Sequence, residues 1–261
     1  MIKLTRGKRR NLRYKRHLIT YLDILGFRDL IAEESPNFIS MAIRRVIEAT
    51  APDKELRRRD REEYVNFSDL IVHTVPVDSR FSENHRTGIV FDRVFDLLHG
   101  QAALVSEGLL LRGALTIGNI ERTYGVLFGP GLINAYDMER KKAQFPRILL
   151  DPFLLQELEN NPNLRMHKYK EEMEYLSPYL RKDTDGLVFV DYLGGLQSEY
   201  APGDYRRFLS KHKTLIEGGL AEFREDARIR PKYEWLKRYH NDIVIDRLGE
   251  GPGYSYLIRP L

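Results

Sequence analysis

The chain has 261 residues, of which 42% are hydrophobic and 31% are charged, and its formal net charge is +4. This composition predicts a soluble globular protein, and the absence of cysteine excludes a disulfide framework and a thiolate metal site. No apolar run approaches the roughly 20 residues of a membrane span, and the N-terminus lacks an apolar signal core. We therefore expect a cytoplasmic protein with no membrane contact.

The first 16 residues form a strongly basic arm. Between Lys3 and Arg16 the chain carries eight lysines and arginines and no acidic residue. Such an arm could bind nucleic acid or acidic lipid, or it could be a solvated terminus. Because no nucleic-acid motif accompanies it, we favour the solvated terminus and expect no nucleic-acid partner.

Hydrophobic periodicity predicts a βαββαβ order of elements, followed by further strands and helices. The predicted strands are 17–25, 64–67, 70–75, 109–117, 147–150 and 186–192, and the predicted helices are 27–34, 37–50, 90–107, 132–142, 205–226 and 231–245. Residues 159–185 are rich in Asn, Pro, Lys and Glu and predict an irregular insertion. The C-terminal elements have too few apolar residues for a second core, so we expect residues 17–261 to form one domain.

Two aspartates stand at the ends of apolar, strand-like runs. Asp23 lies in the segment YLDILGF, residues 21–27, and Asp69 lies in FSDLIV, residues 67–72. Charged side chains are rarely buried without a partner. Two aspartates on neighbouring strand ends could hold divalent metal, and such ions are often completed by substrate phosphates. In the alternative interpretation, Asp23 caps the following helix and Asp69 sits in a hairpin turn.

These segments and those that follow them resemble the class III nucleotidyl cyclases. The strand that opens that family's catalytic domain reads roughly F-x-D-I-x-x-F, and its second metal aspartate lies at a hairpin. The matching pieces of this chain, in order, are 21–27, 68–69, 111–118, 129–136 and 145–150, and the resemblance covers about residues 17–152. Within the family, the chain is most similar to the bacterial pyrimidine cyclases of the Pycsar antiphage system.

The resemblance implies an α+β fold, with a ferredoxin-like βαββαβ cyclase core and a C-terminal helical extension packed on it. It implies intramolecular phosphoryl transfer, in which the ribose 3′-hydroxyl attacks the α-phosphate and pyrophosphate leaves. Asp23, Asp69 and the backbone carbonyl of Ile24 would hold two Mn²⁺ or Mg²⁺ ions. Gly26 and Phe27, where the strand turns into a helix N-terminus, would meet the triphosphate.

The position that reads the base departs from the family pattern. Purine cyclases usually carry Lys or Glu four residues before the second metal aspartate, and this chain has Val65 there. Valine cannot hydrogen-bond a purine edge. Tyr64 and Asn66 flank it and are candidates for substrate binding, because a bulky tyrosine facing the pocket would leave less room for a two-ring base. Tyr64 could equally be a strand aromatic that packs on a sheet face.

The groups that would stabilise the transition state are less clearly marked. The family's asparagine matches Asn134, but Met138 occupies the position of the arginine that normally follows it four residues later. Phosphoryl transfer favours an arginine or lysine that neutralises developing charge. Arg140 and Arg112 are both candidates, and the sequence does not choose between them.

We therefore expect a pyrimidine nucleotide cyclase that converts UTP to 3′,5′-cyclic UMP as a second messenger in antiphage defence. A cytidylate cyclase, an adenylate cyclase and an inactive cyclase-fold binding module are the alternatives. The family builds each site from two protomers, with metal aspartates from one and base and transition-state groups from the other. Because this chain holds one copy of each piece, a head-to-tail homodimer with shared sites is expected.

Overall fold

The computed structural model of the chain describes residues 14–51, 58, 60–79 and 87–259. Residues 1–13, which make up most of the basic arm, lie outside the described residues. None of the helices in the described part of the chain is both long and apolar enough to cross a membrane.

The first half of the chain confirms the predicted βαββαβ order and the α+β class. Its elements are β1 (Lys15–Ile24), α1 (Phe27–Glu33), α2 (Pro36–Thr50), β2 (Glu63–Phe67), β3 (Leu70–Pro76), α5 (Ile89–Ser106) and β4 (Leu111–Thr123). The four strands are antiparallel to their neighbours, in the order β2-β3-β1-β4. This arrangement places the C-terminal end of β1 beside both the β2–β3 turn and the start of β4.

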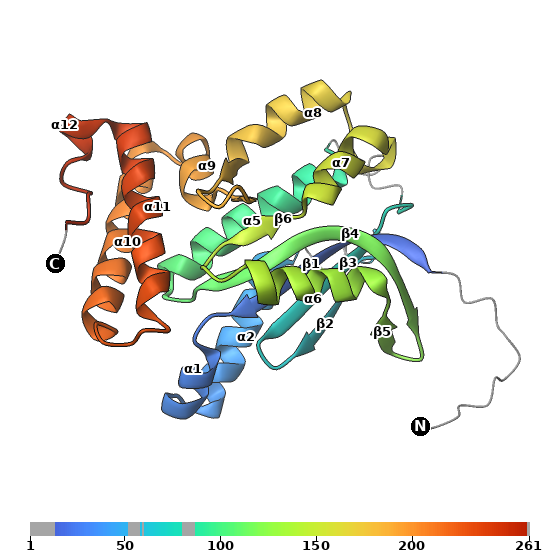
Figure 1. Ribbon diagram of the computed structural model, residues 1–261, viewed down its shortest axis with the longest axis horizontal. Helices are drawn as coiled ribbons and strands as arrows, with labels where there is room; N and C mark the ends of the chain where they lie inside the picture. Colours follow the sequence, from blue (N-terminus) through green and yellow to red (C-terminus); the bar gives the residue numbers. More distant parts are fainter. Residues whose placement is uncertain (1–13, 52–57, 59, 80–86, 260–261) are drawn as a thin grey trace, which may run out of the picture.

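The sheet continues beyond β4 with strands from later in the chain. The elements are β5 (Val126–Phe128), α6 (Pro130–Lys142), β6 (Ile148–Leu150), α7 (Pro152–Asn160), α8 (Tyr169–Leu176), β7 (Leu180–Lys182) and β8 (Val188–Val190). Strand β6 is parallel to β4, β8 and β7 follow antiparallel, and β5 pairs only with β4. Helix α6 lies across β1 and β4 in Figure 1.

The prediction of an irregular insertion at 159–185 is wrong, because α8 and β7 lie within it. The polar composition hid a segment that is ordered by internal hydrogen bonds. Glu172 is 2% exposed and accepts hydrogen bonds from the backbone N–H groups of Met166 and His167 at 3.2 and 3.1 Å. The predicted strand at 186–192 is shorter than expected, because Asp191 caps the helix that follows and accepts a hydrogen bond from the Gly194 N–H at 2.9 Å.

The two faces of the sheet pack against different helices. Residues such as Leu18 and Leu22 of β1 join the large core cluster, which also contains side chains of α2 and α5. Because side chains alternate along a strand, Ile19 and Tyr21 face the other way and pack beneath α6. A β-carbon on Gly118 of β4 would collide with the α6 backbone, so the glycine lets α6 lie close to the sheet.

The predicted C-terminal helical extension is present. It consists of α9 (Tyr192–Glu199), α10 (Pro202–Glu222), α11 (Arg230–Leu248) and α12 (Glu250–Gly253). Buried residues of these helices, including Trp235 and Ile243, belong to the same cluster as the β1 residues. In Figure 1, α10 and α11 stand together at the end of the molecule away from β5.

Two buried histidines connect the helices of this extension. The Tyr192 hydroxyl contacts His212 Nε2 at 2.8 Å, His212 Nδ1 contacts His240 Nδ1 at 2.9 Å, and His240 Nε2 contacts the Tyr256 carbonyl at 2.9 Å. Neutral tautomers satisfy all three contacts. Burial lowers the pKa of His240 to about 4 and places that of His212 well below its usual value.

These depressed pKa values predict that acid destabilises the protein. Between the ordinary histidine pKa of about 6.5 and the folded-state pKa, the unfolded chain binds protons that the folded chain does not. The free energy of unfolding should therefore fall as pH drops through this range, by up to roughly 1.4 kcal/mol per pH unit for each histidine. Urea unfolding at pH 7.5, 6 and 5 measures this slope.

The matched variant is His240→Gln, because a glutamine amide can accept from His212 and donate to Tyr256 without titrating. Its slope should be shallower than that of the wild type. Equal slopes in wild type and His240→Gln would show that the buried pair does not control the acid response.

Candidate active site

Asp23 lies at the C-terminal end of β1, where its carboxylate meets an arginine from the neighbouring strand. The β1–β4 register pairs Asp23 with Arg112, and Arg112 Nε donates to Asp23 Oδ2 at 2.7 Å. The same Nε lies 2.9 Å from Glu139 Oε1 on α6. Asp23 does not cap α1, because Gly26 occupies the N-cap position and no side chain caps that helix. The helix-cap interpretation of Asp23 is therefore wrong.

Asp69 occupies the two-residue turn of the β2–β3 hairpin, which lies beside the end of β1. Phe67 pairs with Leu70 across the turn, and Ser68 adopts a left-handed backbone with φ of 58°. The Asn66 amide donates to the carbonyls of Ser68 and Leu70 at 2.9 and 3.3 Å, which braces this turn. The brace fixes the direction in which Asp69 leaves the hairpin.

The structure brings Asp23 and Asp69 together. Burial raises the pKa of Asp23, and a side-chain hydrogen bond with Asp69 and the charge of Asp69 raise it further, against the lowering effect of Arg112. Two carboxyl groups at hydrogen-bonding distance repel each other when both are ionised. Burial also raises the pKa of Tyr21 to about 12, with contributions from the charges of Glu139, Asp23 and Asp69. The surroundings are therefore rich in negative charge.

Glu139 is a third carboxylate that the sequence analysis missed. It is 6% exposed, and burial raises its pKa, as do the charges of Asp23 and Asp69, while Arg112 opposes them. The helical spacing of the sequence could have revealed Glu139. Glu139 follows Ala135 by four residues, so both side chains lie on the face of α6 that packs on the sheet. A carboxylate in place of an apolar residue on that face indicates a polar partner inside.

Gly26 and Phe27 have the backbone geometry that the sequence suggested, but the Phe27 side chain is buried. Gly26 has φ of 78°, a left-handed conformation that favours glycine. Phe27 is 7% exposed and packs into the core, so only its backbone can face a ligand. Leu25 N donates to Leu110 on the β4 side, and because ladder directions alternate, the Ile24 carbonyl points towards β3 and its turn. Helix α1 has only seven residues, so we assign no role to its N-terminus.

The structure does not bring the Tyr64 ring to the carboxylates, whereas the Asn66 amide donates to the backbone carbonyls on either side of Asp69. Tyr64 pairs with His73 across the hairpin, and their rings lie 6.0 Å apart. His73 is 1% exposed and contacts Thr50 of α2, so Tyr64 lies on the α2 face of the sheet, opposite Asp23. Val65 pairs with Val72, and Val72 packs on the α6 side of the sheet. The Val65 side chain therefore faces the same side of the sheet as Asp23.

Asn134 and Arg140 project from α6 but lie at different points along it. The Asn134 amide donates to Thr116 Oγ1 at 3.0 Å and to Asp151 Oδ2 at 2.8 Å. Thr116 follows Arg112 by four strand residues, so Asn134 lies roughly 13 Å along β4 from the carboxylates. Arg140 is exposed, with its guanidinium over the Tyr136 ring at 5.7 Å.

The donor set suits a hard divalent cation. Asp23 and Asp69 are adjacent carboxylates, and the Ile24 carbonyl points the same way, so oxygen ligands of the kind that Mg²⁺ and Mn²⁺ prefer are gathered at one point. Asp23 and Glu139 contact the Arg112 guanidinium and Asp69 is the third carboxylate nearby, so these four side chains leave negative charge to be balanced. Within the described ranges, no group of three or more His, Cys, Asp or Glu side chains is placed to hold a metal ion, so a cation here would depend on two carboxylates together with backbone and substrate oxygens.

Comparisons with known proteins point to similar structures and to no close sequence relative. No protein-family model and no curated protein matches the chain. The adenylate/guanylate cyclase/hydrolase from Silicibacter pomeroyi is similar at 13% identity, over 68% of this chain and 95% of that chain, with a TM-score of 0.41. The dimeric guanylyl cyclase domain of the RhoGC fusion protein from Blastocladiella emersonii is similar at 14% identity, over 67% and 93%, with a TM-score of 0.40.

The adenylyl cyclase CyaB from P. aeruginosa is also similar, at 12% identity over 68% of this chain and 93% of that chain, with a TM-score of 0.38. At these identities the likeness is one of structure.

Proposed function

We propose that the protein is a metal-dependent nucleotidyl cyclase that forms a 3′,5′-cyclic nucleotide from a nucleoside triphosphate. The observation that carries this proposal is the adjacency of Asp23 and Asp69 at the end of β1, with Arg112 at 2.7 Å from one of them. Carboxylates and a guanidinium at one point suit a substrate that carries both phosphates and metal ions. The arrangement does not provide the nucleophilic side chain with a paired base that acyl transfer would need.

Asp23, Asp69 and the Ile24 carbonyl would hold two Mn²⁺ or Mg²⁺ ions. When bound, such ions stabilise both the attacking and the leaving oxygen of an in-line displacement. Arg112 supplies positive charge beside the same point and can neutralise charge that develops on the phosphates. Glu139 orients the Arg112 guanidinium from the α6 side. In the proposed reaction the ribose 3′-hydroxyl loses its proton to solvent, and its oxygen forms the new bond to the α-phosphorus as the bond to pyrophosphate breaks.

The proposed substrate is UTP, with CTP as the alternative. Val65 supports a pyrimidine, because its side chain faces the α6 side of the sheet and offers no hydrogen bond to a purine edge. Tyr64 does not support this choice, since it lies on the other face. The sequence resemblance adds a second-messenger role in antiphage defence to the proposal.

Base preference is measured by incubating the purified full chain with an equimolar mixture of ATP, GTP, CTP and UTP and separating the products. Cyclic UMP or cyclic CMP should form at least about tenfold faster than the purine products, because a purine edge buried against Val65 would lose its hydrogen bonds to water without replacement. A matched variant, Val65→Lys, should narrow this ratio. A wild type that makes chiefly cyclic AMP or cyclic GMP would remove the pyrimidine assignment and leave the cyclase proposal intact.

We also propose that the active unit is a two-fold homodimer. Asn134 lies roughly 13 Å from the carboxylates of its own chain, so it fits a role at the partner's site better than one at its own. Large apolar side chains are exposed on α6, around β5 and at the β2–β3 turn; they include Ile133 at 65%, Tyr124 at 86%, Val126 at 57% and Phe67 at 77%. Exposed apolar surface of this kind marks an interaction site.

A further inference from the structure

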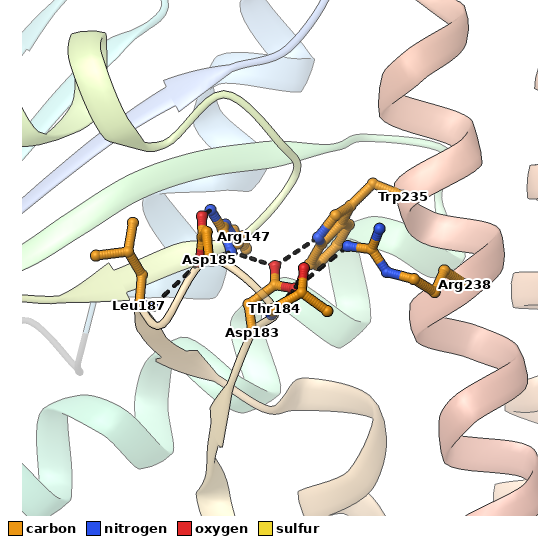
Figure 2. A network of polar contacts seen from close by, with 7 residues as sticks. All are labelled: Arg147, Asp183, Thr184, Asp185, Leu187, Trp235 and Arg238. Carbon is orange, nitrogen blue, oxygen red and sulfur yellow. Dashed lines mark hydrogen bonds and ion pairs between the residues drawn. The ribbon is translucent and has the colours of Figure 1, made fainter.

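A network of buried charges and rings fixes the beginning of α11 against the sheet (Figure 2). Asp183, between β7 and β8, accepts hydrogen bonds from Arg147, from Trp235 Nε1 at 2.6 Å and from Arg238 at 3.2 Å. Arg147 is 1% exposed and also pairs with Asp185. A buried ion pair with several hydrogen bonds holds one geometry closely, so α11 has a defined position relative to β6.

This position brings α11 to the edge of the candidate site. The Trp235 ring stacks on Phe145, with centroids 5.8 Å apart and planes 7° from parallel. The Arg147 guanidinium carbon lies 5.8 Å from the Trp235 ring centroid. The Arg147 carbonyl in turn accepts a hydrogen bond from the N–H of Gly113, the residue after Arg112, at 3.2 Å. Two residues thus connect α11 to the strand segment that carries Arg112.

Lys232 lies one helical turn before Trp235, on the same face of α11. Its side chain is half-buried, and no hydrogen bond or ion pair joins its ammonium to another residue in the part of the chain that the structure describes. Two of the charges that act on it, those of Arg112 and Asp23, belong to the site, and two others, those of Asp29 and Arg228, lie outside it. Burial and the neighbouring Arg112 lower its pKa, whereas Asp23 and Asp29 oppose that shift.

We propose that Lys232 is a substrate-binding residue, which the C-terminal extension adds to the site to contact the polyphosphate of the bound nucleotide. This inference rests on the proposed function. The Lys232 side chain is partly buried and has no carboxylate partner among the described residues, so an anion bound at that point would be favourable. Were Lys232 a counter-ion of Asp23, it would pair with it directly, as Arg112 does at 2.7 Å. Because Arg112 is already held by two carboxylates, Lys232 is the better placed of these two cations to meet an incoming phosphate.

The test compares the full chain with Lys232→Gln, Lys232→Met and Lys232→Arg. The probes are inorganic tripolyphosphate and 3′-deoxy-UTP, which lacks the attacking hydroxyl, each titrated calorimetrically in the presence of Mn²⁺. Mn²⁺ alone is titrated as the second readout. Lys237→Gln, on the same helix and outside the site, is the matched control.

Loss of the ammonium should weaken both phosphate probes by about tenfold to a hundredfold, and Lys232→Arg should restore most of the affinity. Mn²⁺ affinity without nucleotide should stay equal or rise, because a positive charge near Asp23 has been removed. A merely structural role would lower both affinities together, and that result would overturn the proposal. Equal probe binding in wild type and Lys232→Gln would also overturn it. If the wild type binds neither probe, the proposed function itself fails.

Discussion

Replacing Asp23 or Asp69 by asparagine is expected to lower the rate of cyclisation by roughly a thousandfold or more, because loss of a metal ligand removes several kcal/mol of transition-state stabilisation. The fold should survive in both variants. Asp69 lies in a turn that the Asn66 amide braces, and an Asp23→Asn chain retains the Arg112–Glu139 ion pair at 2.9 Å. The expected loss is therefore one of metal binding and not of packing.

Initial rates under saturating Mn²⁺, together with thermal unfolding, measure this prediction. Asp137→Asn is the matched control, because it makes the same change on the exposed side of α6, where Asp137 pairs with Lys141 at 3.0 Å. It should retain wild-type activity. A folded Asp23→Asn or Asp69→Asn protein with near wild-type turnover would show that the carboxylate pair does not hold the catalytic metals.

Mixing two inactive variants is expected to restore activity, up to about one site in each mixed dimer, if the sites are shared between protomers. One chain carries Asp69→Asn and the other carries Asn134→Ala. The Asn134 change should leave the fold intact, because Asp151 keeps its hydrogen bonds from Thr116 at 2.5 Å and from the Phe153 N–H at 3.0 Å. One site of the mixed dimer then has an intact carboxylate pair from one chain and an intact asparagine from the other.

The structure supplies a control for this experiment. Arg112 contacts Asp23 within one chain, so Arg112→Ala mixed with Asp69→Asn should give no recovery. A third mixture, with Arg140→Ala, assigns Arg140 to its own site or to the partner's. No recovery with Asn134→Ala, when subunit exchange is demonstrated by differently labelled chains, would argue against a shared site or against a role for Asn134.

The sequence predicted the core elements because their alternation and helical spacing are strong, and it predicted the hairpin around Asp69 for the same reason. It did not predict which face of β2 each side chain takes, because a strand register fixes that face and no register is written in the chain itself. Tyr64 therefore lies on the α2 side, where it meets His73. Of these two residues, only Val65 faces the α6 side and supports the proposed preference for a pyrimidine base.

The remaining parts of the site depend on tertiary contacts. Glu139 was detectable as a carboxylate on an apolar stripe, but its partner, Arg112, lies 27 residues earlier and only the packing of α6 on β4 joins them. Lys232 is 120 residues from Arg112, and its place depends on the Arg147–Asp183–Trp235 network. No local pattern links such distant residues, so the proposed contribution of the C-terminal extension could not be read from composition.

The most direct test of the central proposal, that the Asp23–Asp69 pair supports nucleotide cyclisation, is to identify the products formed from UTP. The purified full chain is incubated with UTP and Mn²⁺, and the mixture is analysed by chromatography and mass spectrometry. The proposal predicts cyclic UMP and pyrophosphate in equal amounts, with neither formed by the Asp23→Asn chain. Hydrolysis of UTP to UDP and phosphate in place of cyclisation, or the absence of a cyclic product from any of UTP, CTP, ATP and GTP, would contradict it.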